Sequence, residues 1–433
     1  MIGGVRDETS RTVRPRSVDS LRVLMLSRSY PSAVFPNLGL WVERPTALMN
    51  DRPGVDLTVV SPQPYCPPLP DGALRQYSRF RKIVRREVWR GVPVARPRYL
   101  SGPGRSTYPL ESRAYMLGIR KEVERLHFEG PIDVIHAHFI YPEGATAHRL
   151  AARYGIPFVV SEHAPWTPEW FAPRAVRQES LAAGRAASTV MAVSEYIRSS
   201  IAGWLGSDTP LTIVPEGVDG AMFRAEASQP YDRDRILFVG WPTLNKGVDV
   251  LLDAMKLIHE RGQPGRLQLV GGSYYRSTRL MEQRLKAYAD SLMLGPRVAF
   301  VGPRSHAEVA RLMARAAVVV LPSRTEAFGT VLAEALACGT PVVATRCGGP
   351  EDYVTPAVGR LVPVGDPEAL ANALVAVLRE RARFDPGQLR RYALDRFAWP
   401  RIVDSWLDAY GRALGRRPHA PAPTEEMPVG ASG

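Results

Sequence analysis

The chain has 433 residues, enough for two or three domains with cores of their own. Its 45% apolar and 23% charged residues, with 36 Gly and 39 Pro, exclude collagen, a low-complexity polymer and a wholly disordered chain. The net charge of +13 comes almost entirely from arginine, because only five of the 56 basic residues are lysine. Such a charge favours an anionic partner, although a bias in composition explains it equally well.

No apolar run approaches the roughly 18 residues of a membrane span. The first twenty residues mix charges of both signs and lack the apolar core of a secretory signal. The three cysteines, Cys66, Cys338 and Cys347, have neither CxxC nor metal-ligand spacing. We therefore expect a reduced, cytoplasmic protein with disordered tails over residues 1–20 and 416–433.

Short β-branched runs alternate with amphipathic stretches along the rest of the chain. Strands are predicted over 22–26, 56–60, 133–137, 157–161, 189–193 and 211–214, and again over 235–240, 266–271, 297–301, 318–321 and 341–344. Helical stretches such as 249–261, 305–316 and 366–381 fall between them, which indicates parallel sheets built from βαβ units. These strands are too many for one sheet of the usual size of about five, so two sheets are predicted.

The polar segment within 214–235 marks the break between the two sheets. The expected fold is therefore α/β, with one Rossmann-like domain over 21–217, a second over 218–394, and a cleft between them. A helix that begins at Trp399-Pro400, within 395–415, carries an apolar face and is expected to cross back onto the first domain.

One stretch, 322–349, carries the pattern of a ligand site. A strand ends at Pro322, and a helix is predicted from about Thr330 to Cys338, with Gly339 as its left-handed cap. The unpaired N–H groups of that helix would lie at the carboxyl edge of the second sheet, where they attract anions.

Two carboxylates flank this predicted helix terminus. Glu326 precedes the helix and Glu334 lies in its second turn, at most roughly 12 Å away at 1.5 Å per residue. Carboxylates accept strong hydrogen bonds from vicinal hydroxyls, so the pair suits a nucleotide sugar, which has hydroxyls on both sides of a diphosphate. The alternative is that both glutamates belong to a solvated helix face.

Longer motifs strengthen the first interpretation. Four motifs carry a resemblance to a known family: PSRTEAFGTVLAEALACGTPVVAT, RILFVGWPTLNKGVDVLLDAM, IVPEGVDGAMF and FAWPRIVDSWLDAY. With them, residues 22 to about 410 resemble the retaining nucleotide-sugar glycosyltransferases of family 4, which have the GT-B fold. YPSAVFPNLGLWVERPTAL and DVIHAHFIYPEGATA resemble its teichuronic-acid-type branch. The resemblance implies that 21–217 binds the acceptor and that 218–394 binds the donor.

The resemblance also implies roles for individual residues. Glu326 would hold hydroxyls of the transferred sugar, Glu334 would hold the ribose hydroxyls, and Lys246 would contact the leaving diphosphate. The donor-binding set would further include Gly39, Gly240, Gly302, Arg304, and the backbone of Phe328, Gly329, Thr330 and Val331. His163 matches the histidine near the reacting carbon, so the expected catalytic residues are Glu326, His163 and Lys246. A structural role is expected for both His136 and His138, and the alternative is that one of them lines the acceptor site.

Three positions depart from the family pattern. Trp241 stands where the family often has an arginine, so a second phosphate cation is missing there, and Arg304, Arg324 or Arg346 could replace it. Ala327 and Glu216 replace a more common Gly and Asn.

The expected reaction is metal-independent transfer, with retention, from a UDP-, GDP- or ADP-sugar to a polysaccharide, glycolipid or small-molecule acceptor. No cofactor or metal site is expected, because Lys246 and a helix N-terminus can supply positive charge. The alternatives are an epimerase-like GT-B enzyme and a non-catalytic nucleotide binder.

A basic segment over 74–98 holds nine basic residues and one acid. A solvated helix or strand pair is the favoured interpretation. Peripheral contact with an anionic inner membrane face comes next, and nucleic-acid binding comes last.

Overall fold

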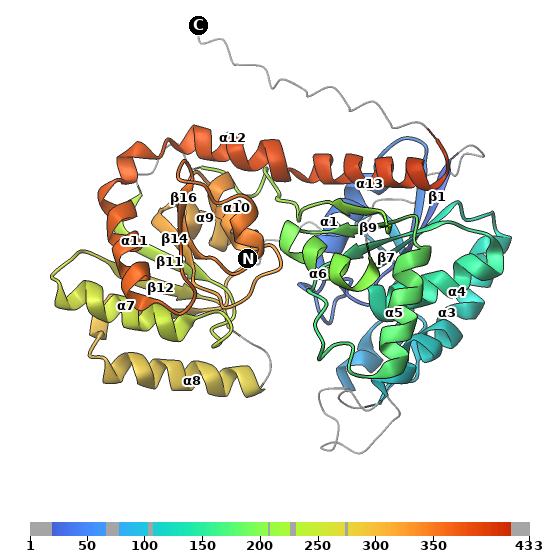
Figure 1. Ribbon diagram of the computed structural model, residues 1–433, viewed down its shortest axis with the longest axis horizontal. Helices are drawn as coiled ribbons and strands as arrows, with labels where there is room; N and C mark the ends of the chain where they lie inside the picture. The colour runs from blue at the N-terminus through green and yellow to red at the C-terminus, as the bar shows by residue number, and fades with distance from the viewer. Residues whose placement is uncertain are drawn as a thin grey trace, which may run out of the picture.

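The computed structural model describes residues 20–65, 78–102, 107–206, 208–225, 231–272 and 276–416. Within this part of the chain, two lobes each surround their own β-sheet (Figure 1). Apart from Ser20 and Arg416, the tails predicted to be disordered lie outside the described residues.

The described N-terminal lobe is built on a sheet with the strand order β10-β9-β8-β7-β1-β2-β5-β4. Its strands are β1 (Leu21–Leu26), β2 (Val55–Val60), β4 (Arg86–Trp89), β5 (Val92–Ala95), β7 (Val134–His138), β8 (Phe158–Glu162), β9 (Thr189–Ala192) and β10 (Leu211–Ile213). All pairs are parallel except β4 with β5, and β3 (Gln63–Pro64) pairs separately with β6 (Arg98–Tyr99). The helices are α1 (Leu40–Asn50), α3 (Glu111–Phe128), α4 (Ala145–Tyr154), α5 (Arg174–Ala186) and α6 (Glu195–Leu205), with short turns η1 (Arg79–Lys82), η2 (Tyr108–Leu110) and η3 (Ile140–Gly144).

The described C-terminal lobe has a parallel sheet with the order β13-β12-β11-β14-β15-β16. Its strands are β11 (Asp232–Val239), β12 (Arg266–Val270), β13 (Val298–Gly302), β14 (Ala316–Leu321), β15 (Val342–Thr345) and β16 (Gly359–Val362). Its helices are α7 (Val248–Glu260), α8 (Arg276–Ser291), α9 (His306–Ala314), α10 (Thr330–Ala337), α11 (Pro367–Arg379) and α12 (Pro386–Phe397), with η4 (Gly295–Arg297), η5 (Gly349–Asp352) and η6 (Arg381–Arg383).

The central strands form because their residues are apolar and β-branched. Every residue of β14 (AAVVVL) is buried, as expected for a parallel strand covered by helices on both faces. Helix starts are fixed by side-chain caps: Ser305 and Glu308 form a capping box on α9, and Asp366 and Asp385 cap α11 and α12.

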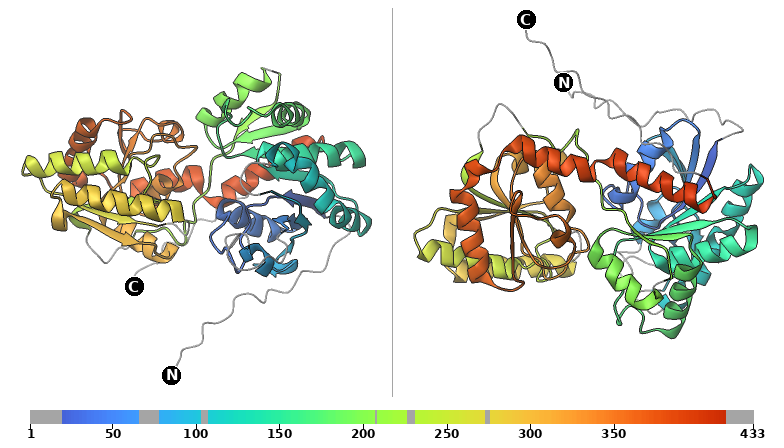
Figure 2. Two further views of the ribbon diagram at one scale, coloured as in Figure 1. Left: turned by 90° about the horizontal axis from the view of Figure 1, so that it is seen from below. Right: turned by 45° about the horizontal axis from the view of Figure 1, so that its top comes forward.

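The last helix, α13 (Trp399–Ala413), leaves the second lobe and packs on the first. Trp406 and Tyr410 are buried in a cluster with Val23, Met25 and Val134 of the first sheet. Figure 2 shows α12 over one lobe and α13 over the other. The predicted crossing helix therefore joins the N-terminal core.

The carboxyl edges of the two sheets face each other. The amide of Glu195, at the start of α6, donates to the Asp352 carboxylate of η5 at 2.6 Å. Arg44 of α1 forms a salt bridge at 3.5 Å with Asp219, which follows the interlobe linker. Helix α6 follows β9 and η5 follows β15, so elements after parallel strands meet across the lobes.

The prediction of two Rossmann-like parallel sheets is confirmed, and each predicted strand overlaps an observed one. The sequence analysis missed β3, β4, β5, β6 and β16. It also placed the start of β11 too late: the strand begins at Asp232, whose carboxylate pairs with Arg266 and Arg235. No helix in the described part of the chain is both long and apolar enough to cross a membrane.

Replacing Trp406 with alanine is expected to lower the free energy of unfolding by about 3–5 kcal/mol, because a buried indole leaves a cavity between α13 and the sheet. Urea denaturation measures the change. Arg401→Ala, on the exposed face of the same helix, is the control and is expected to have little effect. Equal midpoints for the two variants would contradict the bracing role of α13.

Candidate active site

The loop between β14 and α10 is held open by backbone pairing with the next loop. The Glu326 amide donates to the Cys347 carbonyl at 2.9 Å, and the Gly349 amide donates to the Glu326 carbonyl at 3.0 Å. Gly329 then starts α10 with φ 85°, a left-handed conformation that side chains disfavour. The predicted helix start at Thr330 is therefore observed, and its first N–H groups lie at the carboxyl edge of the sheet.

The sequence placed Lys246 and Glu326 in separate motifs, and the structure joins them. The Lys246 ammonium donates to Glu326 Oε1 at 2.5 Å, and the Ser323 hydroxyl donates to the same oxygen at 2.6 Å. Lys246 follows β11 and Glu326 follows β14, the two strands between which the chain reverses its direction of winding. Ligands of open α/β sheets bind at this topological switch point.

Backbone contacts align the two loops. A Cβ at Gly247 would lie 1.8 Å from the Pro322 carbonyl oxygen, so only glycine permits this approach. The Arg324 amide donates to the Asn245 carbonyl at 2.8 Å, and the Arg324 guanidinium pairs with Asp249 at 2.7 Å. The Lys246–Glu326 pair therefore rests on a rigid support.

Glu334 differs from Glu326 because it has no hydrogen-bond or ion-pair partner among the described residues. Its side chain is partly buried in α10, and desolvation raises the pKa of its carboxyl to about 8. An unpaired carboxyl beside a helix N-terminus can accept hydroxyl groups from a ligand, and such hydrogen bonds would favour its charged form.

The neighbouring residues contribute backbone rather than side chains. The Phe328 ring is buried against Tyr353 and Phe397, and the Tyr353 hydroxyl donates to the carbonyls of Phe328 and Gly329. The ring thus anchors the turn from inside, while Thr330 and Val331 occupy the first turn of α10.

A narrow gap without space for a water molecule lies at the carboxyl ends of β11, β12 and β13. It is lined by Phe238, Gly240, Pro242, Leu269, Val270, Gly271, Glu282 and Phe300. Gly240 and Gly302 end two of these strands with φ 153° and 77°, so two predicted donor-binding glycines lie at this edge.

The three arginines proposed as a second phosphate cation differ in their pairing. Arg324 is tied to Asp249, and Arg346 lies 3.9 Å from Glu351. Arg304 donates to the Pro303 carbonyl at 2.9 Å and forms no salt bridge with a described residue. Trp241 is 50% exposed. Arg304 therefore carries the least neutralised charge of the three.

In the first lobe, Gly39 starts α1 from the loop after β1. Its φ is 74°, and a Cβ there would lie 1.9 Å from the Ser29 carbonyl oxygen. The glycine therefore fixes the turn that aims the N-terminus of α1 at the facing lobe.

His163 lies directly after β8, and both of its ring nitrogens are engaged. Nδ1 lies 2.7 Å from Glu216 Oε1, and Nε2 lies 3.0 Å from His138 Nδ1. His136 is fully buried between Tyr410 and Ser161, which agrees with the structural role expected of it. His138 is also buried, but it contacts His163 directly, a link that the sequence analysis missed.

A second charged cluster, also missed, lies at the switch point of the first sheet. Arg28 follows β1, and its guanidinium pairs with Glu111 at 3.1 Å and lies 3.7 Å from the buried Glu143, which follows β7. Burial raises the pKa of Glu143 to about 7. The signal in the sequence was a charged residue shortly after each of two predicted strands, Arg28 after 22–26 and Glu143 after 133–137.

Two other predictions concern neighbouring surfaces. In the basic segment over 74–98, residues 74–77 lie outside the described part. The sequence left open a helix or a strand pair here, and the structure has the antiparallel pair of β4 and β5. Several of its cations are paired internally: Arg86 with Glu122 at 2.5 Å, Arg90 with Glu43 at 3.0 Å, and the fully buried Arg96 with Glu87. The segment is therefore not a purely solvated basic face, because acidic residues of neighbouring elements pair with part of its charge.

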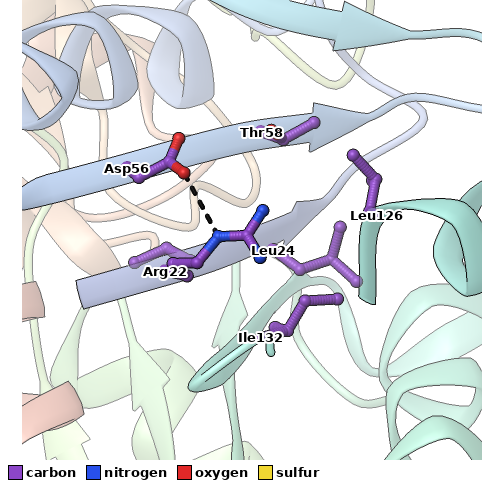
Figure 3. A pocket seen from close by; sticks show the side chains of 7 residues that line it. Arg22, Leu24, Asp56, Thr58, Leu126 and Ile132 are labelled. Carbon is purple, nitrogen blue, oxygen red and sulfur yellow. Dashed lines mark hydrogen bonds and ion pairs between the residues drawn. The ribbon is translucent and has the colours of Figure 1, made fainter. Parts of the chain in front are cut away.

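A further hollow lies at the opposite edge of the first sheet (Figure 3), where Arg22 pairs with Asp56 at 3.2 Å. It is lined by Arg22, Val23, Leu24, Asp56, Thr58, Leu126 and Ile132. Because it lies toward the amino ends of the strands, it is separate from the site above. Among the residues that the structure describes, no cluster of three His, Cys, Asp or Glu side chains could hold a metal ion.

Comparison with known families agrees with this geometry. Residues 222–393 match the family described as "Glycosyl transferases group 1", and residues 51–221 match "Glycosyltransferase Family 4". The chain is 33% identical to a D-inositol 3-phosphate glycosyltransferase from Xylanimonas cellulosilytica, over 73% of this chain and 80% of the relative. A protein of the same name from Mycolicibacterium gilvum is 30% identical, over 72% and 73% of the two chains.

Solved structures share the fold. Sucrose-phosphate synthase from Thermosynechococcus elongatus has a TM-score of 0.73 at 22% identity, covering 91% of this chain and 99% of its own. HepE from Anabaena, in complex with UDP and glucose, has a TM-score of 0.65 at 21% identity, covering 89% and 98%. With the two paired loops at the switch point, these similarities show that the chain is a glycosyltransferase of the family 4 type with the GT-B fold.

Proposed function

We propose that this enzyme transfers a sugar, with retention and without a metal ion, from a nucleoside diphosphate sugar to a hydroxyl acceptor. The observation that carries the proposal is the Lys246–Glu326 pair at the switch point, beside the N-terminus of α10 and the unpaired Glu334. The Anabaena neighbour, solved with UDP-glucose, supports a donor of this class. The proposed acceptor is a polysaccharide, a glycolipid or a small molecule.

The charges of the site suit a departing diphosphate. Lys246 and the first N–H groups of α10 supply positive charge. Arg304, which follows β13 at the same edge of the sheet and forms no salt bridge with a described residue, is proposed as a further cation. In this proposal Lys246 exchanges its contact with Glu326 for phosphate oxygens when the donor binds. Glu326 then accepts hydroxyls of the sugar, and Glu334 accepts those of the ribose.

The reaction breaks the bond between the anomeric carbon and the diphosphate oxygen. The acceptor oxygen forms its bond to the same face of that carbon, and its proton passes to the leaving phosphate oxygen. No protein base is required in this scheme. His163 lies at the facing edge of the first lobe, and the Arg28 cluster lies at the switch point where an acceptor would bind.

The role in surface polysaccharide or glycolipid synthesis is part of the proposal, as is the teichuronic-acid-type branch. The relatives named for D-inositol 3-phosphate make a small phosphorylated polyol a candidate acceptor as well. Contact with an anionic membrane stays a prediction of the sequence.

Lys246→Gln is expected to lower kcat by about 10²–10³-fold, because the leaving diphosphate loses a preorganised cation. The measurement is turnover of UDP-, GDP- and ADP-sugars with and without acceptor, in the presence of EDTA. Glu326→Gln is expected to reduce turnover in the same assay.

Lys256→Gln is the matched control, since Lys256 lies on α7 and pairs only weakly with Glu260 at 3.7 Å. It should keep wild-type turnover. Near-normal kcat for Lys246→Gln, loss of wild-type activity in EDTA, or donor conversion without acceptor to an epimer would each contradict the proposed function.

Glu334→Gln is expected to weaken donor binding and to stabilise the protein at high pH. The folded-state pKa of about 8 lies above the ordinary value of 4.5, so wild-type stability falls as pH rises between these values. Glutamine has no proton to lose. The gain in stability should be small near pH 5 and largest above pH 8.

Chemical denaturation at several pH values measures the stability, and calorimetry with the donor nucleotide measures the affinity. Glu260→Gln, on an exposed position of α7, serves as the control. A variant with wild-type affinity for the nucleotide, or with no stability difference between pH 5 and pH 9, would count against the assigned environment of Glu334.

A further inference from the structure

A chain of four side chains runs from the core of the first lobe to the interlobe linker. His138 Nε2 lies 3.1 Å from Met25 Sδ, and His138 Nδ1 lies 3.0 Å from His163 Nε2. His163 Nδ1 lies 2.7 Å from Oε1 of Glu216, which is in the linker after β10. The chain therefore joins three strand ends to the segment between the lobes.

The chemistry of these atoms decides where the protons lie. A thioether sulfur can only accept a hydrogen bond, so the His138 nitrogen facing Met25 carries the proton. His138 is fully buried, and desolvation lowers its pKa well below the ordinary value, which keeps the ring neutral with a single proton. Its Nδ1 is therefore an acceptor, and the proton in the next contact belongs to His163 Nε2.

The last contact then holds a second proton. His163 already carries hydrogen on Nε2, and a distance of 2.7 Å between Nδ1 and a carboxylate oxygen requires a proton between them. His163 and Glu216 together thus carry two protons, which makes the pair neutral overall. The other groups that face His163 are the rings of His138, Phe139 and Trp41. The Glu162 carboxylate accepts a hydrogen bond from the backbone amide of His163.

Both His163 nitrogens are consequently occupied, and the group that remains for a ligand is Glu216 Oε2. This oxygen has no hydrogen-bond partner among the described residues, and the Glu216 side chain keeps 11% of its surface exposed. Whether the proton between His163 Nδ1 and Glu216 lies on Oε1 or on the imidazole, Oε2 remains an acceptor. An asparagine at this position would also offer hydrogen-bond donors, which the carboxylate does not.

We propose that Glu216 is a positioning and specificity residue, which holds the His163 ring and accepts, through Oε2, a hydroxyl of the sugar or of the acceptor bound between the lobes. This inference rests on the proposed function. It selects a ligand group that can donate hydrogen, and it disfavours a phosphate or carboxylate oxygen at the same place, because both partners would then be acceptors.

The first test is the protonation of His163, which needs no activity. Nitrogen NMR of histidine-labelled protein, with His163 assigned by loss of its signals in His163→Gln, should show protonated Nε2 and a proton at Nδ1. Glu216→Gln should move Nδ1 to the unprotonated range. Met25→Leu, close in volume, should release His138 and change the His163 signals with Glu216 intact. An unprotonated Nε2 in the wild type, or spectra that ignore both substitutions, would overturn the inference.

The second test locates the hydroxyl. UDP-glucose serves as donor probe and D-inositol 3-phosphate as acceptor probe, and calorimetry measures binding to the wild type, Glu216→Ala and Glu216→Asp. Loss of a hydrogen bond to a carboxylate should weaken one ligand about 10- to 100-fold, with partial recovery in Glu216→Asp. Weaker binding of UDP-glucose by the variant assigns the hydroxyl to the transferred sugar, and weaker binding of D-inositol 3-phosphate assigns it to the acceptor.

Glu380→Gln, whose carboxylate pairs with Arg360 at 2.8 Å on the other lobe, should change neither the spectra nor the affinities. Unchanged affinity of Glu216→Ala for both probes would overturn the ligand contact. If the wild type binds neither probe, the ligand contact fails together with the proposed function for these ligands, and the spectra still decide the His163–Glu216 pairing separately.

Discussion

The contact of one ammonium with one carboxylate organises the second lobe. Lys246 and Glu326 lie 80 positions apart in sequence and meet at 2.5 Å because their strands flank the switch point of the sheet. Gly247 lets the two loops approach, and α10 begins directly beyond the paired carboxylate. A cation, an acid and a helix N-terminus thus share one edge, which is the arrangement that a polar, charged ligand requires.

The first lobe repeats this arrangement with different chemistry. Arg28 and Glu143 follow the two strands that flank its own switch point, and Glu111 completes the cluster from α3. Because the two carboxyl edges face each other through α6 and η5, the enzyme presents a cationic and acidic site on each side of the interlobe region. The similar topology of the sheets places comparable positions of both lobes at the facing carboxyl edges.

Much of this was readable in the sequence, because apolar β-branched runs and glycine-ended strands report local structure. The stretch PSRTEAFGTVLAEALACG, for example, predicted where α10 begins, with Glu326 before the helix and Glu334 within it. The missed features depend on partners elsewhere in the chain. Arg96 can be buried because Glu87 and the Pro31 carbonyl accept hydrogen bonds from its guanidinium. The basic residues of this stretch therefore did not indicate that it forms the strands β4 and β5. Likewise, no local pattern joins Glu216, His163 and His138, which come from three segments.

The junction of the lobes sets how they can move. The chain crosses between them twice, and the crossings lie side by side: the Val218 amide donates to the Phe397 carbonyl at 2.6 Å, and the Trp399 amide donates to the Val218 carbonyl at 3.3 Å. A rotation about the line through both crossings keeps these bonds, whereas sliding breaks them. An opening of the lobes about this line would leave Glu216, two residues from Val218, almost still, while the loops that carry Lys246 and Glu326 would move further.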